Sequence, residues 1–266
     1  MISQALDFQA ESDALHKLLD PLSDADFDRK TQFKGWTVND ILQHLHFFNH
    51  AADLTLVDEE GFARLRDEMN AIFDQGESLV VHTDRRLGGI RGHDLLEQWH
   101  DGYTAMAGNF HKSDPKRRLK WFGPDMSALS SVTARLMETW SHAQAIYDLL
   151  GVERADQDRI RNIVIMGNNT FGWTFINRGE EMPADRPYLK LTAPSDEVWE
   201  FNEPSSTNYI EGASSEFCQV VTQTRNIDDT NLTVVGETAN RWMAVAQCFA
   251  GAPQDPPAAG KRFKQA

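Results

Sequence analysis

Apolar residues recur at helical spacing through the first 150 residues of the chain. Pro21 ends the first apolar segment and Gly151 ends the last, as expected at helix termini. Four segments share the pattern and predict helices: residues 3–19, 38 into the fifties, 92–110 and 132–150. Their connections, with one longer crossover, predict a four-helix bundle.

The pattern changes in the second part of the chain. One more apolar helix is predicted over residues 160–175. Alternation then predicts strands at 188–192, 197–201 and 232–235, with helices at 217–224 and 239–249. We therefore expect an α+β fold. Its parts are an N-terminal helical bundle (1–154), a linking helix with a small α+β domain (155–251) and a flexible tail rich in proline, glycine and alanine (252–266).

The second predicted helix carries a histidine on its apolar side. It opens with a capping box, Thr37-Val-Asn-Asp40, in which an aspartate replaces the usual glutamate. His44 follows in an apolar stripe with Leu45 and Phe48, so it faces the bundle interior. A second stripe of this helix is polar throughout and consists of Asn39, Gln43, His46, His50 and Asp53. It predicts a solvent-exposed face, so His46 and His50 should lie away from His44.

The fourth predicted helix adds two further candidate ligands. Glu138 and His142 lie four residues apart, so both project from one side of the helix, beside the apolar stripe. A buried carboxylate needs a cation or several donors to offset its desolvation. Two histidines and one glutamate on facing helices suit zinc, with nickel or another divalent ion as alternatives. Three protein ligands leave one coordination position open, so His44, Glu138 and His142 predict one catalytic-type metal site.

Composition limits the partners. Lys and Arg number 26 against 40 Asp and Glu, a net charge of −14, which argues against nucleic acid or an anionic membrane as a partner. Cys218 and Cys248 lack the spacing of a metal or redox motif. Neither a signal peptide nor a membrane-spanning apolar run is evident, so we expect a cytoplasmic protein that acts on a small molecule.

The segment Gly35-Trp-Thr-Val-Asn-Asp-Ile-Leu-Gln-His-Leu45 resembles the G-W-(T/S)-V-x-D-x-x-x-H-L signature of DinB-like proteins. Among DinB-like proteins, the chain is similar over most of its length to the mycothiol-dependent maleylpyruvate isomerase branch. The resemblance implies the same metal ligands, His44, Glu138 and His142. Four further strings resemble a subgroup labelled with wyosine base formation: 121–127, 134–140, 170–175 and 246–251. No part of the sequence resembles a tRNA-modifying site.

Two details qualify the resemblance. Relatives often show His-Gly-Gln-Asp where this chain has His142-Ala-Gln-Ala145, which affects the support of the ligands and not the ligand set. In the isomerase relatives an arginine of the C-terminal domain reaches the metal pocket. The segment 212–225 resembles the corresponding helix, which makes Arg225 a candidate catalytic clamp for an anionic substrate. A surface arginine at a helix end is the alternative.

The resemblance implies a metal-dependent enzyme in which the ion activates a low-molecular-weight thiol, mycothiol or another. The thiol would act on a small electrophilic substrate, in an isomerase or an S-transferase reaction. Two alternatives remain open: a metal-dependent hydrolase of small amides or esters, and a non-catalytic metal-binding scaffold whose bundle serves association. A homodimer is compatible with each of them.

Overall fold

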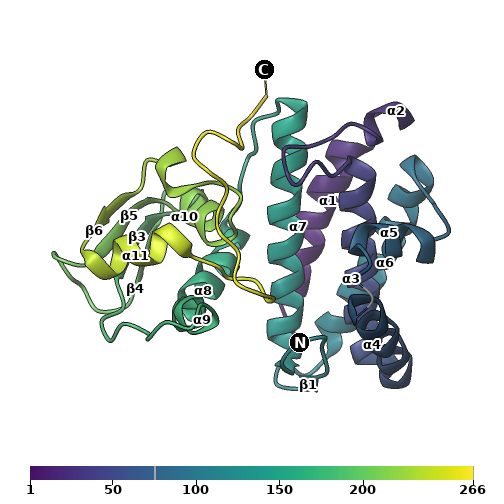
Figure 1. The fold of residues 1–266 in the computed structure, drawn as a ribbon, viewed down its shortest axis with the longest axis horizontal. Helices are drawn as coiled ribbons and strands as arrows, with labels where there is room; N and C mark the ends of the chain where they lie inside the picture. Colours follow the sequence, from purple (N-terminus) through teal and green to yellow (C-terminus); the bar gives the residue numbers. More distant parts are fainter. Residues whose placement is uncertain (75, 266) are drawn as a thin grey trace. The chain divides into compact units, whose positions relative to one another are not determined.

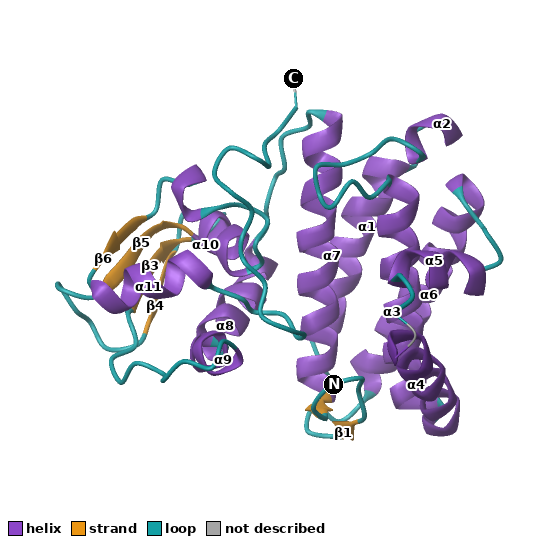
Figure 2. Cartoon of the chain, in the orientation of Figure 1, coloured by secondary structure: helices purple, strands orange, loops and turns teal. Residues whose placement is uncertain are grey.

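The computed structural model describes residues 1–74 and 76–265 (Figures 1 and 2). It forms two compact units, Met1–Ile146 and Tyr147–Ala266. The division falls inside helix α7 (Ala128–Leu150), whereas the sequence analysis places it after residue 154. The last turn of α7 belongs to the C-terminal unit, where Asp148 pairs with Arg225. The expected α+β class, with an N-terminal bundle and a smaller α+β part, is confirmed.

The N-terminal unit is helical. The four predicted helices correspond to α1, α3, α6 and α7, and three shorter or more polar helices join them. Their bounds are α1 (Gln4–Leu19), α2 (Asp24–Phe27), α3 (Val38–Val57), α4 (Glu59–Asp74), α5 (Leu79–Arg86) and α6 (Gly92–Lys112). A two-stranded hairpin, β1 (Arg118–Leu119) and β2 (Met126–Ser127), precedes α7. Helix α3 is central, since it contacts α4, α5 and α6.

The start of α3 is fixed as its sequence predicts. The Thr37 hydroxyl accepts from the backbone N–H of Asp40 at 3.0 Å, and the Asp40 carboxylate accepts from the N–H of Thr37 at 2.8 Å. The chain turns into this cap through Gly35, whose φ of +69° favours glycine. The capping box therefore sets where α3 begins and which side chains face α7.

The predicted solvent-exposed stripe of α3 is wrong at its first two positions. Asn39 and Gln43 are buried. The Asn39 carbonyl oxygen accepts from the backbone N–H of Gly92, and the Gln43 amide donates to Asp84 and to the carbonyl oxygen of Ile90. Segment 84–92 begins in the last turn of α5, continues to the start of α6, and covers this side of α3. Polar residues that the pattern marks as exposed are in fact hydrogen-bonded inside the bundle, although the Gln43 Oε1 atom has no partner among the described residues.

The C-terminal unit contains a four-stranded sheet in the order β4-β3-β5-β6, in which β3 pairs with β4 antiparallel and with β5 parallel. Leu189, Leu191 and Ile210 are buried while Lys190 is exposed, because side chains alternate between the two faces. Helix α10 contacts β3, β5 and α8. The strands are β3 (Tyr188–Thr192), β4 (Val198–Phe201), β5 (Tyr209–Ala213) and β6 (Thr233–Val235). The helices are η1 (Asp158–Ile160), α8 (Arg161–Asn169), α9 (Phe171–Asn177), α10 (Ser214–Val221), η2 (Ile227–Asp229) and α11 (Glu237–Val245).

Several details of this unit differ from the sequence expectation. The linking helix is broken at Thr170, whose hydroxyl donates to the carbonyl oxygens of Met166 and Gly167. Helix α10 ends early, before Gln223 with its φ of +56°. The expected flexible tail has no helix or strand over residues 252–265, yet hydrogen bonds hold it, for example from Asn226 to the carbonyl oxygen of Pro257. Residue 266 of that tail lies outside the described residues.

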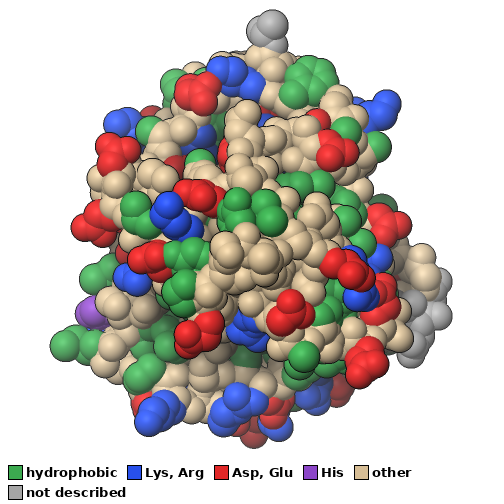
Figure 3. All heavy atoms as spheres, turned by 90° about the vertical axis from the view of Figure 1, so that its left-hand side faces the viewer, with side chains coloured by type: hydrophobic (Ala, Val, Ile, Leu, Met, Phe, Trp, Pro, Cys, Tyr) green, Lys and Arg blue, Asp and Glu red, His purple; other side chains and the backbone are tan. Residues whose placement is uncertain are grey.

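Charges are mixed on the face drawn in Figure 3, where acidic and basic side chains alternate without a large patch of one sign. Over the described residues, every helix is too short or too polar to span a bilayer.

Candidate metal centre

Three predicted ligands meet between α3 and α7. In the part of the chain that the structure describes, His44, Glu138 and His142 are the one group of three potential ligands whose donor atoms lie within 4.8 Å of one another. The Nε2 atoms of His44 and His142 lie 3.3 Å and 3.2 Å from the same oxygen of Glu138, Oε2. The four-residue spacing on α7 and the inward face of α3 thus bring together what the sequence predicts.

The spacing of these atoms fits a small divalent ion. Ligand atoms bound at about 2.1 Å around a tetrahedral ion lie roughly 3.4 Å apart. The two measured His–Glu separations, 3.3 Å and 3.2 Å, are close to that value. A neutral imidazole and an ionised carboxylate are also the forms that bind metal. The cluster therefore has the donor types and the spacing of a three-ligand site, and ligation itself stays a prediction.

Burial controls the protonation of the cluster. Burial, reinforced by the neighbouring His142, lowers the pKa of His44 to about 4, so its imidazole is neutral at neutral pH. Burial acts to raise the pKa of the Glu138 carboxyl, but hydrogen bonds with His142 and His44 outweigh it and leave that pKa well below its usual value. The cluster is thus an ionised carboxylate between imidazoles, with His44 neutral.

Aromatic rings enclose the cluster. The Trp36 ring stacks on His142 with centroids 5.9 Å apart, and the Phe33 ring meets the same histidine edge-on at 5.0 Å. Phe48 lies 4.8 Å from the His44 ring. The turn before α3 places Trp36, since the backbone N–H and hydroxyl of Thr31 both donate to the Trp36 carbonyl oxygen. The motif that begins with Gly35-Trp36 therefore supplies a wall of the site as well as a helix cap.

One atom of the cluster lacks support. The second ring nitrogen of His44, Nδ1, is buried and has no hydrogen-bond partner among the described residues. Metal-bound histidines usually donate from that nitrogen to a carboxylate or carbonyl oxygen. Support of the ligands is therefore the feature in which this site is least complete.

The sequence analysis missed two polar residues beside the cluster. Arg135 precedes Glu138 by one turn of α7, and its Nε donates to Asn49 of α3 at 3.0 Å. Both side chains are buried. The spacing 135, 138 and 142 places all three α7 residues on one helix face, which is the signal that could have identified Arg135.

Arg225, the predicted catalytic clamp, is engaged within the C-terminal unit. Its Nη1 and Nη2 donate to the two carboxylate oxygens of Asp148 at 2.8 Å and 2.6 Å, and Nη1 also donates to the carbonyl oxygen of Thr224. The side chain is 12% exposed, so Arg225 is more enclosed than the alternative of a surface arginine at a helix end expects. A role toward substrate stays a prediction for this residue.

His46 and His50 are not members of the ligand cluster. His46 lies against α6, where a Cβ added at Gly102 would meet its ring at 3.4 Å, and burial lowers the pKa of His46 to about 4. His50 is exposed. Both differ from His44, whose ring lies among the other ligands.

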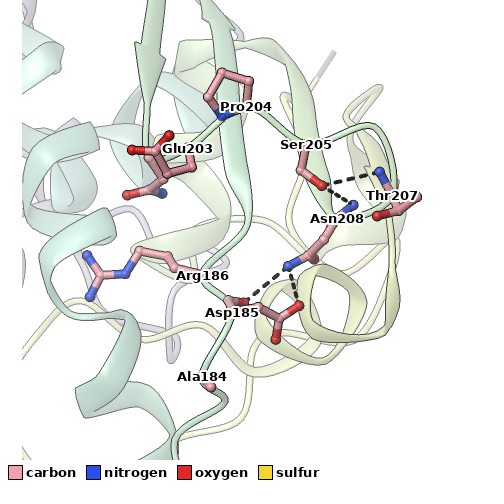
Figure 4. A pocket seen from close by; sticks show the side chains of 9 residues that line it. Ala184, Asp185, Arg186, Glu203, Pro204, Ser205, Thr207 and Asn208 are labelled. Carbon is pink, nitrogen blue, oxygen red and sulfur yellow. Dashed lines mark hydrogen bonds between the residues drawn. The ribbon is translucent and has the colours of Figure 1, made fainter.

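A separate hollow of about 570 Å³ lies in the C-terminal unit (Figure 4). Its polar side chains are occupied with one another: Asn208 donates to the backbone and side chain of Asp185, and Ser205 accepts from the backbone N–H of Asn208. The Arg186 guanidinium lies over the Phe171 ring at 5.4 Å. These contacts stabilise loops, so the chemistry of the described residues is concentrated in the bundle.

Comparison with known proteins identifies the family of this chain. Residues 8–147 match the family model described as the mycothiol maleylpyruvate isomerase N-terminal domain, which is more than half of the chain. The uncharacterized proteins MT0041 and Rv0036c, from two strains of Mycobacterium tuberculosis, are each 34% identical over 251 residues, covering 93% of this chain and 95% of theirs. Crystal structures of the mycothiol-dependent maleylpyruvate isomerase and of a mutant share the fold, with TM-scores of 0.51 and 0.52 at 12% identity, over 82% of this chain and 87% of those chains. This chain therefore belongs to the mycothiol maleylpyruvate isomerase family.

Proposed function

We propose that the protein is a metal-dependent enzyme that uses a low-molecular-weight thiol, mycothiol first among the candidates, on a small electrophilic and anionic substrate. The reaction would be an isomerisation or an S-transfer. One observation carries the proposal: the convergence of His44, Glu138 and His142 within 4.8 Å, in a chain of this family.

The residues of the chain would prepare the ion and exclude water. His44 and His142 would hold it through Nε2, and Glu138 through a carboxylate oxygen. Because the pKa of His44 is about 4, protons do not compete for its lone pair at neutral pH. A bound divalent ion supplies the chemistry of lowering the pKa of a thiol that coordinates it, which makes thiolate available at neutral pH. Phe33, Trp36 and Phe48 keep the surroundings apolar.

The two reaction types share a first step. The thiolate adds to an electrophilic carbon of a double bond conjugated to a carbonyl group, and the electron pair of that double bond moves onto the carbonyl oxygen, which gives an enolate. Rotation about the new single bond, followed by collapse of the enolate and expulsion of the thiolate, gives an isomer and regenerates the thiolate. Protonation of the adjacent carbon instead leaves the sulfur attached, which is S-transfer. The same site would serve both, and the substrate would decide between them.

A turnover assay tests the proposal. Protein loaded with zinc, nickel or manganese would be mixed with maleylpyruvate or simple unsaturated carboxylates, with and without mycothiol or glutathione. We expect turnover that needs both metal and thiol and is lost in His142→Ala but kept in His50→Gln, a matched change outside the cluster. Hydrolysis of esters or amides without thiol would contradict the thiol reaction and favour a hydrolase. No turnover at full metal content would favour a scaffold.

Three points stay predictions from the sequence: zinc as the ion, a homodimer as the assembly, and membership of the subgroup labelled with wyosine base formation. Metal analysis of the purified protein tests directly whether the ion is zinc. The donor set of two imidazoles and a carboxylate supports zinc ahead of magnesium or calcium, which prefer oxygen ligands alone.

A further inference from the structure

Arg135 is a buried cation without a complete set of partners. Its side chain belongs to a residue only 4% exposed, and Nε donates to Asn49 Oδ1 at 3.0 Å. Its Nη2 is buried and has no hydrogen-bond partner among the described residues. Asn49 is 1% exposed, and its Nδ2 is likewise buried and without a partner in the described part of the chain. Two linked side chains therefore leave two donors unsatisfied in one place.

Unsatisfied buried donors of this kind are costly. A buried donor without a partner keeps the full cost of leaving water, and that cost is larger for a charged donor than for a neutral one. Arginine is almost never fully buried unless it is paired. Both unsatisfied atoms are donors and one of them carries positive charge, so the complementary group is an anionic acceptor. The planar guanidinium matches a carboxylate, which accepts two parallel N–H bonds.

The two donors lie next to the metal cluster. Arg135 and Glu138 are three residues apart on one face of α7, and the charge of Arg135 contributes to the lowered pKa of both Glu138 and His44. Phe48 connects the two groups, because its ring lies 4.8 Å from the His44 ring and 5.8 Å from the Arg135 guanidinium carbon. The same ring packs against Trp121 and Phe122 of the loop after β1. An anion held by Arg135 would therefore have an apolar wall on one side and the metal ligands on another.

We propose that Arg135 and Asn49 form the site that binds a carboxylate group of the substrate, one helical turn from Glu138. Arg225 differs from Arg135 in this respect, since Asp148 already accepts from two nitrogens of Arg225. Only the statement that the bound anion is the substrate rests on the proposed function. The anion site itself is a property of the described bundle.

Calorimetry with succinate as the probe tests the site without turnover. Metal-loaded wild-type protein is expected to bind succinate and not its neutral analogue succinamide. Arg135→Met is expected to weaken succinate binding at least about tenfold, as loss of a charged hydrogen bond does. Arg85→Met, a change at an exposed arginine paired with Glu77, is the control and should leave affinity unchanged. Loss of binding in Arg225→Met but not in Arg135→Met would overturn the assignment.

Asn49→Asp is the sharper variant. It places a carboxylate at the atom that now accepts from Arg135, so an internal anion would compete with succinate. We expect weaker succinate binding together with a higher melting temperature, a combination that simple damage to the fold would not produce. Unchanged succinate affinity in this variant would contradict the proposal, and the variant remains informative if Arg135→Met fails to fold.

Turnover then separates this inference from the proposed function. If succinate binding depends on Arg135 but no thiol-dependent turnover is found, the anion site stands and the proposed function fails. If turnover needs metal and thiol while Arg135→Met changes neither succinate binding nor the KM of an anionic substrate, the anion site fails and the proposed function stands.

Discussion

Two buried arginines, one in each unit, have opposite surroundings. Arg225 in the C-terminal unit meets Asp148 through two hydrogen bonds of 2.8 Å and 2.6 Å, and both side chains are largely buried. Arg135 in the bundle is more deeply buried, yet it donates from Nε to a neutral amide and leaves Nη2 without a partner among the described residues. Burial alone therefore does not show whether an arginine has its hydrogen-bond partners.

The difference separates structural polar groups from functional ones. A buried ion pair with both partners present is a closed arrangement, which needs nothing further from solvent or ligand. The bundle has the reverse: a carboxylate shared by two imidazoles, an imidazole nitrogen without a partner, and a guanidinium with an unused donor. Such incomplete groups raise the energy of the protein, and binding of the proposed metal and anion would satisfy them.

The largest expected effect is at the closed pair. Asp148→Ala leaves the Arg225 guanidinium buried without its carboxylate, and breaking such a pair typically costs about 3–5 kcal/mol. Urea denaturation of wild type and variant measures the loss in unfolding free energy. A loss below about 1 kcal/mol would show that the pair behaves like an exposed one.

The next largest effect is a loss of folding stability at low pH. The unfolded chain takes up a proton at His44 below about pH 6.5, but the folded metal-free protein does so only below about 4. Between these values the unfolded state binds more protons, so stability falls as the pH falls, by an amount on the order of 3 kcal/mol from this residue. His46, whose pKa burial also lowers to about 4, contributes a second share.

Denaturation of metal-free protein at several pH values between 4 and 7 measures how steeply the unfolding free energy changes with pH. His44→Gln should reduce the dependence of the unfolding free energy on pH, because one of the four histidines whose pKa burial lowers (His44, His46, His50 and His82) no longer titrates. An unchanged slope would mean that His44 is not the neutral buried group described above.

A smaller effect of opposite sign is expected at the open arginine. Arg135→Met removes a buried charge that has no carboxylate partner, and with it a desolvation cost that the single hydrogen bond to Asn49 only partly offsets, so we expect a neutral or stabilising change of about 1 kcal/mol. Chemical denaturation gives the comparison with Asp148→Ala directly. Destabilisation of Arg135→Met by several kcal/mol would place both arginines in the same structural class and end the contrast.

The smallest effect is expected at the two histidines outside the cluster. Replacing His46 and His50 together by glutamine should leave the metal content per chain unchanged, because neither belongs to the ligand group. Elemental analysis after dialysis measures it. Loss of metal equal to that of His44→Ala would mean that α3 presents a different face to α7.

The sequence predicts the ligand cluster because each ligand follows from local rules. The capping box fixes the start of α3, and the four-residue spacing fixes Glu138 and His142 on one side of α7. Helix α4 could also have been predicted, since its buried apolar residues recur every three or four positions: Phe62, Leu65, Met69 and Ile72. Its high charge conceals that pattern.

Other features depend on contacts between distant segments, and local spacing does not determine them. Strand β5, Tyr209–Ala213, contains a glutamate and a glycine, and it is a strand because it pairs with β3 in parallel. Asn39 and Gln43 are buried because Gly92 and Asp84 supply their partners. Whether Arg135 has a carboxylate beside it is likewise decided only once α3 and α7 meet.

Metal content per chain in wild type and in His142→Ala tests the central claim most directly. The wild-type protein is expected to hold about one divalent ion, and His142→Ala close to none, since one of three protein ligands is lost. The variant should keep the circular dichroism spectrum and cooperative unfolding of the metal-free wild type, because the role proposed for His142 is to bind the ion and not to fill the apolar core. A His142→Ala protein that retains a full ion per chain would contradict the account.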